Sequence, residues 1–268
     1  MRRSTSIAIW RGVVAIIVFL VLWQLGSTSK SWMGFALPWI SAIPAPTDVI
    51  LIWAALVHDS GYWQSCYLSI WRVSVGFLAA MVVGIPFGLA LAVNRTAYGV
   101  LFPTFEVLRP IPPLAWVPLS IIFWPTQELS ITFVTFLGAF FTMVLNVVGG
   151  AKSIDIRYFQ AARSMGSSSF DIFRRIILPG VLPSIAVGAA VGMGITWNVV
   201  VAAEMISGGA SQATGAGGGL GFFIWNSYVG GSYPQIVVGM ISIGIAGYLS
   251  SELLRRLGNR VTPWLRSR

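Results

Sequence analysis

Three consecutive stretches in the middle of the chain set its fold class. Residues 129–148 read LSITFVTFLGAFFTMVLNVV, residues 152–175 read KSIDIRYFQAARSMGSSSFDIFRR, and residues 182–205 read LPSIAVGAAVGMGITWNVVVAAEM. A helix that crosses a bilayer needs about 20 predominantly apolar residues. The first and third stretches meet that length, whereas the second is polar and basic. The pattern therefore predicts two membrane-spanning helices joined by a polar connector.

The composition of the whole chain also indicates an integral membrane protein. Of its 268 residues, 56% are hydrophobic and 9% are charged, and the mean hydropathy is +0.80. A soluble domain carries roughly 25% charged residues, so this chain has too few to cover a surface in water. Its length leaves room for about five to seven spanning helices and short loops.

The scarcity of reactive side chains excludes several functions. Cys66 is the only cysteine and His58 the only histidine, so an intrachain disulfide, a Cys/His metal cluster and paired His/Cys catalysis cannot be built. The net charge of +9 would suit a nucleic-acid binder, but orientation in a bilayer explains it better, because Lys and Arg collect on cytoplasmic loops. We expect no catalytic residue, no metal ion and no cofactor in this chain.

Four further apolar runs complete a prediction of six transmembrane helices. They cover about residues 12–25, 66–93, 98–124 and 234–254. The first run follows a basic segment and is interpreted as a spanning helix. The alternative, a cleaved signal peptide, lacks a small-residue cleavage site directly after the run. Arg72 interrupts the second run near its outer end, where a long side chain can snorkel to water.

A mixed segment separates the first two spans. Residues 48–57 predict a short helix, capped by Thr47 or Asp48, which is too short to cross the membrane and would lie at the outer interface. We accordingly divide the chain into three parts. Residues 1–64 hold the N-terminal spanning helix and the interfacial helix, residues 65–258 form a core with a cytoplasmic loop at 152–179, and residues 259–268 form a basic tail.

The distribution of basic residues predicts the orientation. With the N-terminus inside, fourteen of the 17 Lys and Arg residues fall on inner segments, only Lys30 and Arg72 fall outside, and Arg109 lies at membrane depth. Because Lys and Arg concentrate on the cytoplasmic side, both termini are expected to face the cytoplasm.

Two ladders of small residues predict close helix packing. Gly76, Ala80, Gly84 and Gly88 recur at every fourth position of the second span, and Ser184, Gly188 and Gly192 do so in the fifth. Small side chains at this spacing let a second helix approach closely in lipid. The alternative is a chance arrangement, since glycine is common in membrane helices.

A proline-rich break in the third apolar run is a candidate lining of a transport path. Arg109 is followed by Pro110, Pro112 and Pro113, and three prolines in four positions cannot continue a helix. Non-helical backbone at membrane depth persists only when it is buried in protein or lines a watery cavity. Arg109 would meet an anionic solute there, or else pair with Glu106 three residues earlier.

Glu204 is a second ionisable residue inside a predicted span. Burying such a group is costly, so it indicates function. A carboxylate suits an anion path poorly, and we therefore favour a gate or a partner contact, for instance with backbone donors, over contact with the solute. Trp116, Trp197 and Asn198 are weaker candidates for the path, because aromatic residues in membrane proteins more often serve packing or interface anchoring.

The polar connector has its own predicted structure. Helical periodicity places one amphipathic helix near residues 154–165, Gly166 breaks it, and Ser167–Ser169 can cap a second helix over residues 170–177. Plain connectors rarely hold this much regular structure. The segment therefore predicts a helix–glycine–helix projection toward the cytoplasm.

This projection resembles the coupling loop of permease subunits of bacterial ABC importers. That signature reads Glu-Ala-Ala, three residues, Gly, nine residues, Ile-x-Leu-Pro. The spacing matches here at Ala161, Ala162, Gly166, Ile176, Leu178 and Pro179. Gln160 replaces the usual Glu and loses its charge, so docking to an ATPase would rely on shape and neutral hydrogen bonds. The alternative interpretation is an ordinary interfacial amphipathic helix.

Three further segments resemble the nitrate/sulfonate/taurine/bicarbonate subfamily of these permeases. They are LRPIPPLAWVPL at 108–119, WNVVVAAEM at 197–205 and GLGF at 219–222, and the resemblance covers about residues 40–258. The Gly/Ser/Ala-rich run at 208–218 is longer than the subfamily has before its Gly-Leu-Gly element. We expect this longer run to alter the contact with an external binding protein.

The resemblance implies an all-α membrane protein with a type I, MetI-like importer core and an extra N-terminal helix, located in the bacterial inner membrane. It also implies three partners: a second copy of this chain, two cytoplasmic ATPases that bind ATP and Mg²⁺, and a periplasmic or lipid-anchored substrate-binding protein. This chain has no Walker A sequence, and its glycine run at 215–221 follows no strand, so a nucleotide site is not expected here.

The leading functional prediction is the membrane subunit of an ATP-driven importer for a small anion of the nitrate, bicarbonate, sulfonate or taurine class, working by alternating access. The alternative is an autonomous secondary transporter or channel. Such carriers often show broken helices in two corresponding repeats, whereas this sequence has one proline break. A membrane enzyme is disfavoured, because the eight carboxylates are scattered and form no recognisable acid–base site.

Overall fold

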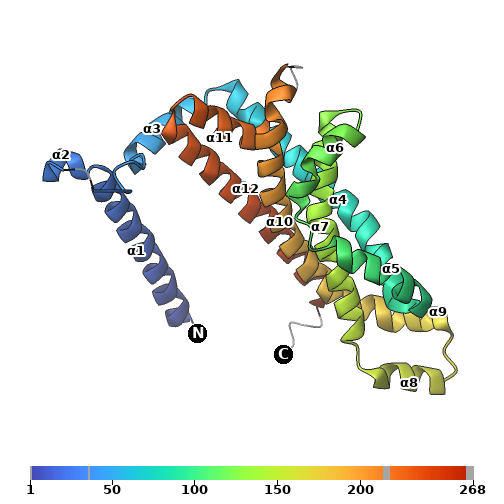
Figure 1. The fold of residues 1–268 in the computed structure, drawn as a ribbon. Helices are drawn as coiled ribbons and strands as arrows, with labels where there is room; N and C mark the ends of the chain where they lie inside the picture. The colour runs from blue at the N-terminus through green and yellow to red at the C-terminus, as the bar shows by residue number, and fades with distance from the viewer. Residues whose placement is uncertain (1, 36, 214–217, 264–268) are drawn as a thin grey trace. The chain divides into compact units, whose positions relative to one another are not determined.

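The computed structural model describes residues 2–35, 37–213 and 218–263, and the regular structure in these ranges is entirely helical. The predicted all-α class is therefore confirmed. Along the chain the elements are α1 (Arg2–Ser27), α2 (Ser29–Met33), α3 (Pro46–Leu56), α4 (Ser60–Val93), α5 (Arg95–Leu108), the 3₁₀-helix η1 (Pro113–Trp116), α6 (Val117–Phe123), α7 (Gln127–Lys152), α8 (Ile156–Ser164), α9 (Ser169–Ile172), the π-helical turn η2 (Phe173–Ile177), α10 (Leu178–Ala213), α11 (Gly219–Val229) and α12 (Tyr233–Val261) (Figure 1).

Five of these segments are long and apolar enough to cross a bilayer, namely Trp10–Ser27 of α1, then α4, α7, the run Ser169–Ser207, and α12. The pair α5 and η1–α6 passes the same test together but is bent by 87° at the proline break. The six predicted spans correspond to these five segments and the bent pair.

The chain forms two compact units. One contains Met1–Trp63 and Phe223–Ser242, and the other contains Gln64–Phe222 and Ile243–Arg268. The smaller unit holds α1, α2 and α3. Within it the buried Tyr62 hydroxyl lies 2.8 Å from the Ser242 hydroxyl, and the Tyr62 ring packs edge-on against Phe223.

The predicted cap of the short third helix is wrong. The residue at its N-cap is Ala45, without a side-chain bond, and Pro46 is the first helical residue. Proline suits that position because its missing N–H has no intrahelical acceptor there. Thr47 is engaged elsewhere, since its hydroxyl accepts a hydrogen bond of 3.3 Å from the Gln24 amide.

The larger unit is built on α7, which packs between α4 and α10. A Cβ on Gly76 or Gly88 of α4 would lie 2.8 Å from Thr135 Cγ2 or Val147 Cβ of α7, respectively, and one on Gly84 would touch Met143 at 3.4 Å. On the other side, a Cβ on Gly188 would lie 2.7 Å from Asn146 Cβ, and Gly192 faces Ala139 at 3.6 Å. Ser184 faces Gly150. Small residues thus permit both close approaches.

The second connector helix and the fifth span, placed from the sequence at residues 170–177 and 182–205, belong to one continuous run. Elements α9, η2 and α10 follow one another without interruption, although Pro179 and Pro183 lie in the run. The Leu178 N–H bonds to the Phe173 carbonyl five residues back, which is the π-type pattern that inserts an extra residue into a helix. Membrane helices tolerate proline where such local adjustments satisfy the freed backbone groups.

Candidate functional site

The connector between α7 and α10 forms a helical hairpin with defined caps, which we call the coupling hairpin (residues 152–179). Asp155 begins α8 by accepting a 2.9 Å bond from the Arg157 N–H. Gly166 has φ +76°, and a Cβ on it would meet nothing within 4 Å. Glycine is therefore needed there for its left-handed backbone rather than for space. The Ser168 hydroxyl then begins α9 by accepting from the Asp171 N–H at 3.1 Å.

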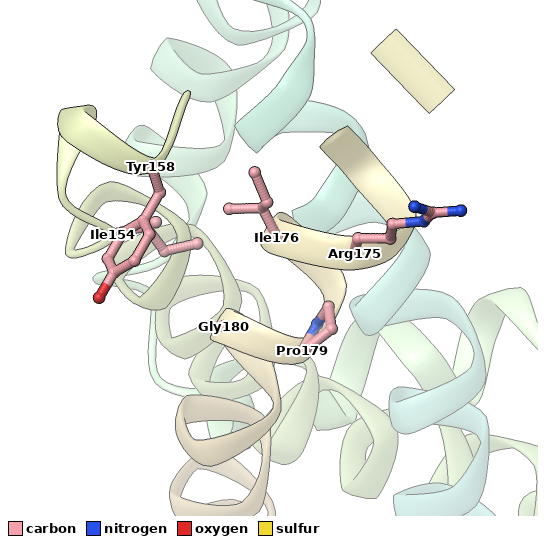
Figure 2. A pocket seen from close by; sticks show the side chains of 6 residues that line it. All are labelled: Ile154, Tyr158, Arg175, Ile176, Pro179 and Gly180. Atoms are coloured by element: carbon pink, nitrogen blue, oxygen red, sulfur yellow. The ribbon is translucent and has the colours of Figure 1, made fainter. Parts of the chain in front are cut away.

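A pocket of about 400 Å³ lies inside the coupling hairpin. It is lined by Ile154, Tyr158, Arg175, Ile176, Pro179 and Gly180. Figure 2 shows Ile154 and Tyr158 on one side, facing Ile176 and Pro179 on the other. Two residues of the predicted signature, Ile176 and Pro179, therefore line this pocket. Leu178 is half-buried next to them.

The outer face of the coupling hairpin exposes both polar and apolar side chains. Gln160 and Ala161 are exposed, whereas Ala162 is buried. Met165 is 78% exposed and Phe170 is 68% exposed, and these two residues were not singled out from the sequence. Exposed apolar groups gathered on one projection are typical of a protein contact surface.

A second site is a buried cluster of charged groups in the larger unit. Arg72 of α4 donates to Glu204 of α10 through Nη1, at 2.9 Å, and to Glu128 of α7 through Nε, also at 2.9 Å. A further bond joins Arg72 Nη2 to Glu128. The predicted snorkelling of Arg72 to water is wrong, because its side chain is fully buried. Two carboxylates hold it inside the protein instead.

Glu204 also holds the start of α11. Its carboxylate accepts from the Ser69 hydroxyl at 2.8 Å and from the Gly221 N–H at 2.9 Å. The Leu220 N–H donates to Ser69 Oγ at 2.8 Å. The first N–H groups of a helix have no intrahelical partner, so Glu204 and Ser69 act as a cap supplied by other helices.

The two glycines of the Gly-Leu-Gly element allow the start of α11 to lie close to Glu204 and to α10. Gly219 has φ +75° and a Cβ there would overlap the Glu204 carboxylate, while a Cβ on Gly221 would overlap the Val201 carbonyl oxygen. Glu204 and this element are both recognisable from the sequence, but separately. Ser69 and Glu128 are not, since nothing in the spacing of these residues indicates that their helices meet.

The proline break and the other path candidates form none of the described hydrogen bonds of this cluster. Arg109 Nη1 lies 3.4 Å from Glu106 Oε1, and both side chains are about half exposed. The pairing with Glu106 is therefore present, and contact of Arg109 with a solute stays a prediction. Pro110 and Pro112 are exposed and Pro113 is half-buried at the start of η1.

The three remaining candidates occupy different surroundings. Trp116 is half-buried, Asn198 is exposed on α10, and Trp197 is buried and donates from Nε1 to Ser250 Oγ of α12 at 3.0 Å. Within the described ranges, no hydrogen bond or ion pair joins Arg109 to Trp197, Asn198 or Glu204. In the same ranges no group of three His, Cys, Asp or Glu side chains could hold a metal ion.

Comparison with known proteins places this architecture in a family. The sequence profile described as "Binding-protein-dependent transport system inner membrane component" matches residues 84–267. The nitrate import permease protein NrtB of Synechocystis sp. is 34% identical over 262 residues, covering 94% of this chain and 89% of the relative. The taurine transport system permease protein TauC of Escherichia coli is 32% identical over 263 residues, covering 95% and 93%. The bicarbonate transport system permease protein CmpB of Synechococcus elongatus is 29% identical over 248 residues, covering 88% and 84%.

Solved structures share the fold. A chain from inward-facing conformations of the MetNI methionine ABC transporter superposes with a TM-score of 0.60 at 22% identity, covering 74% of this chain and 95% of that chain. A chain of a bacterial ABC transporter involved in the import of the acidic polysaccharide alginate gives a TM-score of 0.61 at 14% identity, covering 98% and 100%.

The fold is that of the membrane permease of MetI-like ABC importers. The chain belongs to the family of binding-protein-dependent transport system inner membrane components, alongside permeases named for nitrate, taurine and bicarbonate.

Proposed function

We propose that this chain is the membrane-spanning subunit of an ATP-driven importer, and that the coupling hairpin receives the movement of a partner ATPase. The observation that carries the proposal is the unbroken helical run from the hairpin into the bilayer: α9, η2 and α10 are continuous. A displacement of Phe170 in α9 would therefore be passed along one continuous helical run into the fifth span.

The docking contact uses shape and apolar area. Gln160 and Ala161 are exposed, as are the apolar side chains of Met165 and Phe170. Ala162 is buried, and Gly166 forms the turn that follows α8. Gln160 offers a neutral hydrogen-bonding end in place of the family's usual carboxylate. Ile176, Leu178 and Pro179 join the hairpin to the span and complete the coupling segment.

The assembly that this mechanism requires contains two copies of the permease, a dimer of cytoplasmic ATPases and a periplasmic or lipid-anchored binding protein. The ATPases supply the ATP and Mg²⁺ sites. Binding of ATP closes the ATPase dimer, and the permease cavity changes from outward-facing to inward-facing, a ligand-driven two-state transition. We propose that the coupling hairpin and both termini lie in the cytoplasm and that the protein sits in a bacterial inner membrane, in keeping with the concentration of Lys and Arg on these segments.

The proposed solute is a small anion. The relatives named for nitrate, taurine and bicarbonate support this class, and the exposed Arg109 at the proline break is the positive group proposed to meet the solute on its path. Pro110, Pro112, Pro113, Trp116, Trp197 and Asn198 complete the proposed path. Glu204 is proposed as part of a gate, because its carboxylate is engaged by α4 and α11 rather than open to a solute. Thermal stabilisation of the cognate binding protein by nitrate, bicarbonate or taurine would identify the ion.

The coupling role is tested by placing a charge on the exposed face of the hairpin. Met165→Asp should abolish co-purification of the ATPase while the permease remains inserted and folded. Thr96→Asp, which adds the same charge at an exposed position in the first turn of α5, is the control and should retain the ATPase. Retention of the ATPase by the Met165 variant would contradict the docking role. Uptake of solute by proteoliposomes that hold the permease alone would instead support an autonomous transporter.

A further inference from the structure

A groove lies beside the crossing of α10 and α12 in the larger unit. At the crossing a Cβ on Gly258 would lie 2.6 Å from Ala186 Cβ, so the two helices are as close as glycine allows. The cavity next to it has a volume of about 440 Å³. It is lined by Pro183, Ala186, Val187, Ala190 and Val191 of α10 and by Arg255, Gly258, Asn259 and Thr262 at the end of α12.

The α10 wall of this groove is apolar along its whole length. Residues 183–191 read PSIAVGAAV and carry no charge. Val187 and Val191 are 58% and 51% exposed, respectively. At a rise of about 1.5 Å per residue, this wall extends roughly 12 Å along the helix. That surface suits a hydrocarbon chain.

The α12 side contributes one basic side chain, Arg255, to the lining of the groove, and further arginines lie near it in the sequence. Arg255, Arg256 and Arg260 follow one another near the helix end, and Glu252 is the one acidic residue of α12. Glu252 binds the Nε atoms of Arg255 at 3.1 Å and of Arg256 at 2.8 Å. A guanidinium group has five N–H donors, so these bonds leave donors for phosphate oxygens. The excess of positive charge remains at the groove.

We propose that this groove binds an anionic phospholipid. Its phosphate lies at Arg255 and Asn259, and one acyl chain lies along Val187 and Val191. Basic pockets between membrane helices accept anionic head groups, and the planar arginine fork matches phosphate geometry. A second copy packed here by twofold symmetry would bring two arginine clusters together, and their repulsion favours the lipid.

The test measures lipid retention by the full-length chain purified in a mild detergent. Native mass spectrometry should show retained dioleoylphosphatidylglycerol and little retained dioleoylphosphatidylcholine. Arg255→Gln should weaken phosphatidylglycerol binding roughly tenfold, the effect of losing one charge-assisted hydrogen bond. Arg256→Gln is the matched control, because Arg256 pairs with the same glutamate but does not line the groove, and should change binding by no more than about twofold.

A variant that fills the groove distinguishes specific binding of a lipid in the groove from non-specific attraction of an anionic lipid to the arginines. Ala190→Phe leaves every arginine in place and should abolish retention of phosphatidylglycerol. Equal retention of both lipids, an equal loss in the two arginine variants, displacement of the lipid by inorganic phosphate, or normal retention in the Ala190 variant would each overturn the proposal. So would a lipid-free dimer that Ala190→Phe dissociates. Arg255 and Arg256 are exposed, so both variants should fold. A loss of lipid binding in the Arg255 variant would therefore reflect the binding site and not unfolding.

Discussion

Arg72 Nη1 lies 2.9 Å from Glu204 Oε1, and neither side chain is exposed. The same guanidinium binds Glu128, whose side chain is 43% exposed. One positive charge therefore joins α4, α7 and α10, and Glu204 extends the link to the first turn of α11. Within the cluster only Glu128 reaches the surface. If either Arg72 or Glu204 were removed, water could not take its place as a hydrogen-bond partner of the other.

Removing only one partner of the Arg72–Glu204 pair should strongly destabilise the protein. Arg72→Gln leaves Glu204 buried without its counter-charge, a change that costs about 3–5 kcal/mol in comparable buried pairs. The double variant Arg72→Met, Glu204→Gln removes both charges and should recover most of that loss, because neutral replacement of a buried pair is often tolerated. Thermal unfolding in detergent measures both effects.

The control for this prediction is an exposed ion pair. Arg109→Gln removes the partner of Glu106 at a site where both side chains are about half exposed. We expect a change below about 1 kcal/mol. Equal destabilisation of the Arg72 single and double variants would show that packing around Arg72, rather than the unpaired charge, determines the loss.

Gly166→Ala should loosen the coupling hairpin. The backbone there has φ +76°, and a side chain in the left-handed region costs roughly 1–2 kcal/mol. Hydrogen exchange of α8 should become faster and ATPase binding weaker. Gly149→Ala adds a methyl group to a helical glycine with open space around it and should leave both readouts unchanged. Unaltered exchange in the Gly166 variant would contradict the need for that conformation.

Gly221→Ala should displace α11 from α10. A Cβ at Gly221 would overlap the Val201 carbonyl and lie 2.8 Å from Glu204 Cβ, and such overpacking costs about 1–3 kcal/mol. Gly194→Ala is the matched control in α10, since nothing lies within 4 Å of its added Cβ. Alanine favours a helix over glycine by about 1 kcal/mol, so this control should be neutral or stabilising. Thermal unfolding that ranks the two variants in the opposite order would refute the close approach.

Gln160→Ala should leave ATPase binding within a few-fold of the wild type, whereas Met165→Asp should abolish it. The glutamine is exposed and neutral, so its loss removes at most one solvent-accessible hydrogen bond, worth about 1 kcal/mol. Titration of the purified ATPase onto the permease in nanodiscs compares the two. If the Gln160 variant alone lost binding, docking would depend on that side chain and not on the apolar face.

The spans were predictable because apolar length is a local property of the chain. The runs at 129–148 and 182–205 lie within α7 and α10, and the break at residues 109–113 separates α5 from α6. Element ends were less predictable. The start of α3 at Ala45 depends on contacts that the residue types do not reveal. The same holds for the continuity of η2 with α10, which depends on a hydrogen bond to the carbonyl five residues back.

The sequence by itself determined that this is a helical membrane protein with a helix–glycine–helix connector, because hydropathy, proline and glycine act within a few residues of their own position. Only the tertiary structure decided that Arg72 is buried with Glu128, 56 residues away, and with Glu204, 132 residues away. The apolar residues of membrane helices do not indicate which helices pack together. Helix pairing depends instead on small residues and on buried polar groups, which come into contact only when the helices pack. The role of a charged residue inside a span therefore follows from its neighbours in space.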